Sequence, residues 1–75
     1  MKRKYSEVKS IIENTEVKEL LGKQPSHSLS TGYYTPSGAN WSYHFQIVKH
    51  KDGYFEVVTV FGSIKGAREV YIEVV

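Results

Sequence analysis

The sequence of 75 residues contains no cysteine, one methionine, one tryptophan and two prolines. The lack of cysteine excludes disulfides, thiolate metal sites and thiol nucleophiles. Apolar residues form no run near the roughly 20 needed to cross a bilayer. The basic start Met1–Lys4 is followed by interspersed charges rather than by the apolar segment of a secretory signal. We therefore expect a cytoplasmic protein without a membrane partner.

The chain also lacks a strong charge of one sign, because ten Lys and Arg oppose eight Asp and Glu, for a net charge of +2. A dedicated nucleic-acid-binding domain usually carries a larger and more clustered basic excess. The composition is instead 40% apolar and 24% charged, with 13% aromatics, which is typical of a packed domain rather than a disordered chain. The length predicts one small domain over residues 1–75.

The segment from about residue 6 to residue 21 favours helix, but its apolar side chains fall on two nearly opposite sides of a helical wheel. The first group is Val8, Ile11 and Ile12, and the second is Val17, Leu20 and Leu21. A single straight helix would leave one group exposed. We therefore predict two short helices that bend at Asn14-Thr15, where Asn14 can end one helix and Thr15 can cap the next.

The segment from about residue 28 to residue 75 is rich in β-branched and aromatic side chains. They divide into four predicted strands at roughly 28–34, 41–50, 54–62 and 68–75, joined by short turns. Short connections make neighbouring strands antiparallel. The predicted fold class is α+β, with two short N-terminal helices packed on one face of a four-stranded antiparallel β-meander.

The register of the predicted sheet depends on the loop lengths. A three-residue loop Lys51–Gly53, with Gly53 left-handed, followed by a tight Lys65-Gly66 turn, gathers the large apolar residues on one face. A two-residue turn would instead set the aromatic face of the second strand beside Val58 and Val60. We predict the three-residue loop and a core face of Trp41, Tyr43, Phe45, Ile47, Phe55, Val57, Phe61, Val70, Ile72 and Val74.

The opposite, open face is the predicted binding surface. It carries His44, Tyr54, Glu56, Val58, Val60, Tyr71 and Glu73. Mixed apolar, polar and tyrosine-bearing surfaces are typical of protein interfaces, and the edge of the last strand offers a second route through strand addition. The leading prediction is a small non-enzymatic module that binds a protein partner or a second copy of itself.

The alternative is weak binding of single-stranded nucleic acid. The sheet tyrosines would stack with bases, and a basic set would contact phosphates. That set comprises Lys2, Arg3, Lys4, Lys65 and Arg68. Glu56, Glu69 and Glu73 on the same predicted face would oppose a phosphate backbone.

Catalytic and metal-binding patterns are weak. His44 and His50 share a strand face but lie about 20 Å apart, too far to hold one ion. Gly62–Arg68 has glycines and cations but not the spacing of a phosphate-binding loop. We predict no catalytic residue, metal or cofactor.

Overall fold

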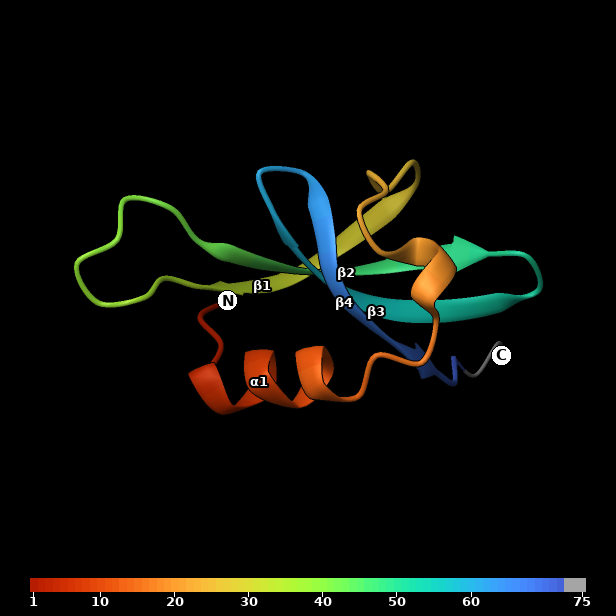
Figure 1. Ribbon diagram of the computed structural model, residues 1–75, viewed down its shortest axis with the longest axis horizontal. Helices are drawn as coiled ribbons and strands as arrows, with labels where there is room; N and C mark the ends of the chain where they lie inside the picture. Colours follow the sequence, from red (N-terminus) through yellow and green to blue (C-terminus); the bar gives the residue numbers. More distant parts are fainter. Residues whose placement is uncertain (73–75) are drawn as a thin grey trace.

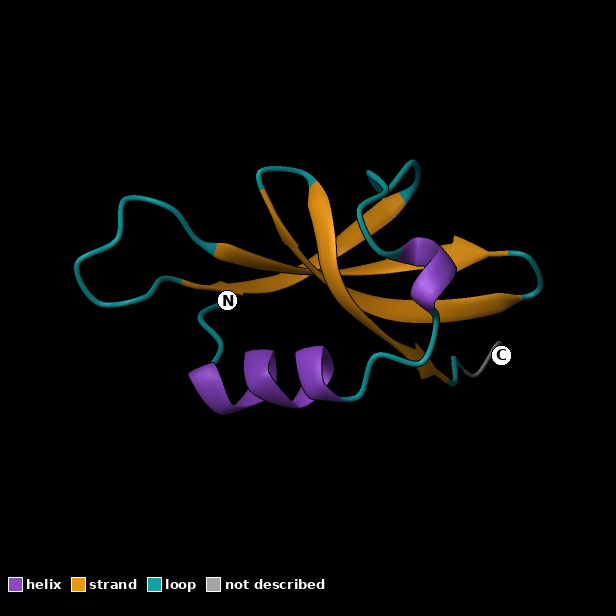
Figure 2. Ribbon diagram, viewed as in Figure 1, coloured by secondary structure: helices purple, strands orange, loops and turns teal. Residues whose placement is uncertain are grey.

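The computed structural model describes residues 1–72 and contains one α-helix, one 3-10 turn and four strands (Figures 1 and 2). The helix is α1 (Tyr5–Glu13), the turn is η1 (Lys18–Leu20), and the strands are β1 (Ser28–Tyr34), β2 (Tyr43–His50), β3 (Gly53–Val60) and β4 (Ser63–Val70). The strands form one sheet in the order β1-β2-β3-β4, and each neighbouring pair is antiparallel. The predicted α+β class with an antiparallel sheet is confirmed.

The helix α1 starts one residue before the predicted boundary and ends at the predicted bend. At its start, the Lys4 backbone N–H donates to Glu7 Oε1 at 3.0 Å, which places a carboxylate at the positive end of the helix dipole. At its end, the Thr15 hydroxyl donates to the Ile12 carbonyl at 2.7 Å instead of capping a second helix. The second predicted helix is absent from the described residues, where only the three-residue turn η1 forms.

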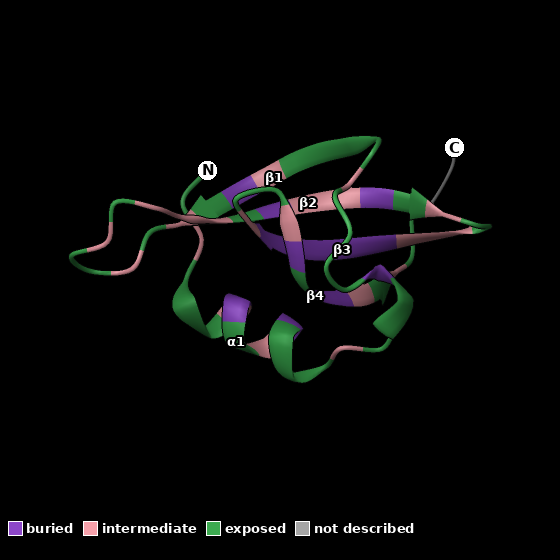
Figure 3. Ribbon diagram, turned by 45° about the horizontal axis from the view of Figure 1, so that its top comes forward, coloured by how far each residue is buried: buried purple, intermediate pink, exposed green. Residues whose placement is uncertain are grey.

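Each face of the sheet carries its own small core, so the prediction that both helical segments cover one face was wrong. Figure 3 shows how the buried residues are distributed along the strands and α1. On one face, α1 packs Val8 and Ile11 against Phe45 and Val58. On the other face, Leu20 of η1 packs with Val48, Phe55, Val57, Ile64 and Ala67. The two apolar groups of the N-terminal segment thus pack on opposite faces of the sheet, because the chain after α1 crosses from one face to the other.

The β2–β3 loop has two residues rather than three. Lys51 takes the positive φ of 55°, and His50 pairs directly with Gly53. This loop places Phe45 opposite Val58. The predicted register was therefore wrong, and strand alternation moves Val58 from the open face into the core beneath α1.

The β3–β4 turn lies at Phe61-Gly62, where φ is 52° and 82°. As a result β4 spans Ser63–Val70 rather than 68–75, and the predicted turn at Lys65-Gly66 lies inside the strand. Gly66 serves packing instead: a Cβ at this position would lie 2.9 Å from the Ile12 Cα. Phe61 is not a core residue, because 82% of its surface is exposed.

Replacing Phe61 by Asn is expected to raise the free energy of unfolding by up to about 1 kcal/mol, because a left-handed backbone strains a bulky residue and suits Asn. The exposed phenyl ring has little packing to lose. Chemical denaturation followed by the fluorescence of Trp41 measures the change. A loss of stability in this variant would contradict the strain argument.

Parts of the chain outside the sheet cover segments of both of its edges. On β4, the Glu16 N–H donates to the Ala67 carbonyl at 3.3 Å, and Ile64 exchanges backbone hydrogen bonds with Gly22 and Lys23 at 2.9 and 3.2 Å. On β1, the Met1–Arg3 segment runs parallel to the strand and exchanges two backbone hydrogen bonds with Tyr33. The basic N-terminal residues are thus part of the folded structure.

Candidate functional site

The predicted open-face residues do not form one surface. Val58 is fully buried and Glu56 is 6% exposed, so neither is available for contact with a partner. His44 pairs with Thr59 and lies on the face opposite to Val58. The other members are half-buried Tyr54 and Val60, exposed Tyr71 beyond β4, and Glu73, which lies outside the described residues.

Glu56 is the centre of a partly buried ion cluster. Its Oε1 accepts hydrogen bonds from Arg68 Nε at 3.0 Å and Nη2 at 2.6 Å. Its Oε2 lies 3.7 Å from Arg3 Nη2, and Arg3 also binds Glu7 and stacks its guanidinium over the Phe45 ring at 4.4 Å. The Arg3 hydrogen bond and the Lys4 backbone N–H lower the pKa of Glu7. The cluster joins the N-terminal segment, α1, β3 and β4.

The ion cluster around Glu56 includes two of the five cations that were predicted to contact nucleic acid. Arg3 and Arg68 are occupied by carboxylates. Lys2, Lys4 and Lys65 are exposed, and within residues 1–72 their ammonium groups form no ion pair within 4 Å. Three of the five predicted cations therefore remain available.

A row of four aromatic rings lies where β1 ends and β2 begins, and we name it the aromatic end. It comprises Tyr5, Tyr34, Tyr43 and Trp41, with successive ring centroids separated by 5.7, 6.3 and 5.0 Å. Tyr34 and Tyr43 are cross-strand partners that pack against the core beneath α1. Tyr5 is 55% exposed and the other three rings are half-buried, so the row extends the core outward to the surface.

Two lysines are backbone neighbours of residues in or next to the aromatic end. Lys4 precedes Tyr5, and Lys2 forms the bridge to Tyr33 beside Tyr34. The nearest carboxylate along α1 belongs to Glu7, which is paired with Arg3.

A second acidic centre lies away from the aromatic end, at the β2–β3 turn. Glu19 there accepts from His50 at 3.0 Å and Lys51 at 3.2 Å, and the His50 hydrogen bond is the largest cause that lowers the pKa of Glu19.

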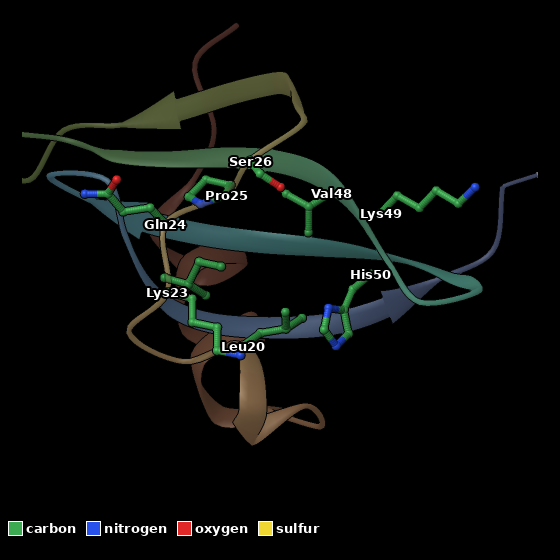
Figure 4. Close-up of a pocket in the computed structure, with 9 residues that line it drawn as sticks. Leu20, Lys23, Gln24, Pro25, Ser26, Val48, Lys49 and His50 are labelled. Atoms are coloured by element: carbon green, nitrogen blue, oxygen red, sulfur yellow. The ribbon is translucent and has the colours of Figure 1, made fainter.

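A small pocket lies on the face opposite to α1, between the segment Leu20–Ser26 and β2 (Figure 4). Its volume is 150 Å³, and its lining combines apolar Leu20, Pro25, Val48 and Ile64 with Lys23, Gln24, Ser26, Lys49 and His50. A wider polar hollow of 450 Å³ adjoins it across Gln24 and Pro25 and includes His44 and Gln46. Of the two histidines that line these hollows, His50 is hydrogen-bonded to Glu19 and His44 lies in the wider one with Ser28 and Ser30.

Residues 1–72 contain neither a metal-binding cluster nor a membrane-spanning helix. No group of three His, Asp or Glu side chains there is close enough to hold a metal ion. No helix in that range has the length and apolar character needed to span a bilayer.

No protein-family model matches the chain, and neither a curated protein nor a solved structure matches it.

The aromatic end was not predicted from the sequence, because Trp41 and Tyr43 were expected in the core and Tyr5 and Tyr34 had no predicted role. A signal was present in the spacing. Tyr34 and Tyr43 flank the β1–β2 loop, and strands that pair on both sides of a loop bring such residues together. The contribution of Tyr5 required the position of α1, which the sequence pattern does not specify.

Proposed function

We propose that the protein is a non-enzymatic interaction module that binds a protein partner through the aromatic end. The observation that carries this proposal is the continuous row of four half-exposed rings at one end of the sheet. Tyrosine and tryptophan dominate the energetics of protein interfaces, because each offers a large apolar surface and a polar group. This surface replaces the open sheet face as the proposed contact region.

Preorganisation supports the same proposal. Tyr34 and Tyr43 are held by strand pairing, by their ring–ring contact and by the core beneath α1. Side chains already fixed in the unbound protein lose little conformational entropy when a partner binds. A row of ordered rings is therefore suited to recognition of a matching apolar surface.

Binding of single-stranded nucleic acid is the second candidate function. It is favoured by the lysines Lys2 and Lys4 beside the rings and by the pairing of Glu7 and Glu56 with arginines. The glutamate at position 56, which opposed this function in the sequence analysis, is thus neutralised. Bases would stack on the rings, and the lysines would contact phosphates.

Replacing Trp41 by Ala is expected to weaken partner binding at least about 10-fold, the loss typical of an interface anchor. Tyr71→Ala is the matched control, because Tyr71 is 92% exposed and lies beyond β4. Proteins that bind to the immobilised wild-type chain are identified and purified. Each is then titrated by calorimetry against the wild-type, Trp41→Ala and Tyr71→Ala proteins.

The titration is repeated at two salt concentrations with a protein partner and with a mixed-sequence oligonucleotide. Affinity for a protein that depends on Trp41 and changes little with salt supports the proposal. Affinity for the oligonucleotide that falls steeply with salt supports the second candidate, because bound phosphates release counterions. Equal binding by wild-type and Trp41→Ala proteins would contradict both.

A further inference from the structure

The outer edge of β1 is covered over only part of its length. Within residues 1–72, backbone hydrogen bonds reach that edge at Tyr33, from the Met1–Arg3 segment. Figure 3 shows β1 at the margin of the sheet, with its first half exposed and no described element beside it. The edge of β4, by contrast, is hydrogen-bonded at two positions to the chain around η1.

The alternation of strand hydrogen bonds identifies the unpaired groups. Tyr33 directs both its N–H and its carbonyl outward, to Met1 and Arg3. The bulge between Ser30 and Gly32 counts as a single position in the ladder. Ser28 and Ser30 therefore also direct their backbone groups outward, whereas Leu29 directs its own toward β2.

The features that normally prevent strand addition are confined to one end of this free edge, where a bulge lies between Ser30 and Gly32 and the Arg3 guanidinium donates to the Thr31 carbonyl at 3.2 Å. Proteins protect exposed edges with lysine, proline or inward-pointing charges. The segment Ser28–Thr31 carries none of these. Its one large apolar side chain, Leu29, is 70% exposed. The edge thus combines free hydrogen-bonding groups with an unburied apolar residue.

We propose that β1 pairs with β1 of a second copy of this chain, antiparallel and with a two-fold axis at Leu29. Ser28 then lies opposite the partner subunit's Ser30, and Ser30 opposite the partner subunit's Ser28. The outward groups of these residues form four backbone hydrogen bonds. Leu29 lies against the partner subunit's Leu29 in a non-hydrogen-bonded pair, where side chains approach most closely.

A second copy is favoured over an unrelated strand because the segment is complementary to itself. Under the two-fold axis, the outward donors and acceptors of Ser28 and Ser30 meet one another, and the exposed apolar residue meets its own equivalent. No charged side chain in Ser28–Thr31 opposes its symmetry mate. An isologous contact of this kind also closes at two subunits and does not propagate.

The dimer is expected to be weak. The N-terminal segment occupies the edge at Tyr33, so the pairing is confined to a few residues. So short a contact buries less than the roughly 1,200 Å² at which stable interfaces begin. Because Ser28 and Tyr34 lie at opposite ends of β1, the two aromatic ends of the dimer point away from each other and stay accessible. A partner with repeated sites would then bind with avidity.

The test is sedimentation equilibrium of the full chain from micromolar to millimolar concentration. We expect a monomer–dimer equilibrium that Leu29→Lys weakens at least about 10-fold, because like charges then face each other across the axis. Phe61→Lys is the matched control, since Phe61 is an equally isolated apolar residue, 82% exposed, away from the edge. Amide exchange at Ser28 and Ser30 is expected to slow as concentration rises.

A chain that stays monomeric at millimolar concentration would overturn the inference. So would a dimer that Leu29→Lys leaves intact, and if Trp41→Ala disrupts that dimer, the contact lies at the aromatic end. Circular dichroism and thermal unfolding of each variant separate lost association from lost folding. The outcome is independent of the proposed function, because Trp41 and Leu29 are changed in separate proteins.

Discussion

Phe45→Ala is expected to lower the free energy of unfolding by about 3–5 kcal/mol, the range for truncation of a buried phenylalanine. Phe45 is the largest fully buried side chain in residues 1–72, and it contacts both the core beneath α1 and the Arg3 guanidinium. A domain of this size has a total stability near the low end of the usual 5–15 kcal/mol. The variant should therefore be largely unfolded at 37 °C by circular dichroism.

Phe61→Ala is the matched control for this truncation. It removes the same atoms from a ring that is 82% exposed at the β3–β4 turn. We expect its free energy of unfolding to stay within about 0.5 kcal/mol of wild type, as for most surface substitutions. Equal losses in the two variants would mean that the core beneath α1 does not determine stability.

The first three strands could be predicted because their signals are local. β-branched and aromatic runs separated by Pro36, Gly38 and Gly53 place β1, β2 and β3 close to their observed positions. The end of α1 was likewise predictable from the helical wheel, because a continuous helix would expose one of two apolar groups. Local patterns thus located most of the elements correctly.

The register and the fourth strand could not be predicted, because two turns use residues that rarely take positive φ. Lys51 takes this conformation where Gly53 was expected to, and Phe61 takes it in the β3–β4 turn. Gly66 resembles a turn residue in sequence, but its lack of a Cβ accommodates the backbone of Ile12. These choices depend on tertiary packing, which outweighs the local preference for glycine.

The candidate binding surface followed the register. The predicted register depended on a single apolar sheet face and on the loop length that produces one. β3 is apolar on both faces, which is typical of a strand covered on both sides. Val58 was the decisive residue: its burial beneath α1 removes the open-face surface. The half-exposed aromatic end then becomes the better candidate.

Glu56→Ala is expected to lower the free energy of unfolding by about 3 kcal/mol, because it leaves Arg3 and Arg68 without their shared carboxylate. This is the low end for a broken buried pair, since the Arg68 side chain is 39% exposed and can be rehydrated. Glu13→Ala is the control. Its pair with Lys9 is exposed on both sides, so we expect a loss below about 0.5 kcal/mol in urea denaturation.

The same substitution distinguishes the two candidate functions, because Glu56 neutralises Arg68 and lies 3.7 Å from Arg3, which is next to Lys2 and Lys4 in the sequence. Where folding of the Ala variant is too weak, Glu56→Gln removes the charge and keeps the side-chain size. If the protein binds single strands, freeing Arg68 should raise oligonucleotide affinity, and each added phosphate contact should steepen the salt dependence by about 0.7 in log–log slope, whereas Arg3 stays paired with Glu7. If it binds a protein through the aromatic rings, affinity should stay within about 2-fold, because Glu56 is buried and offers almost no surface to a partner.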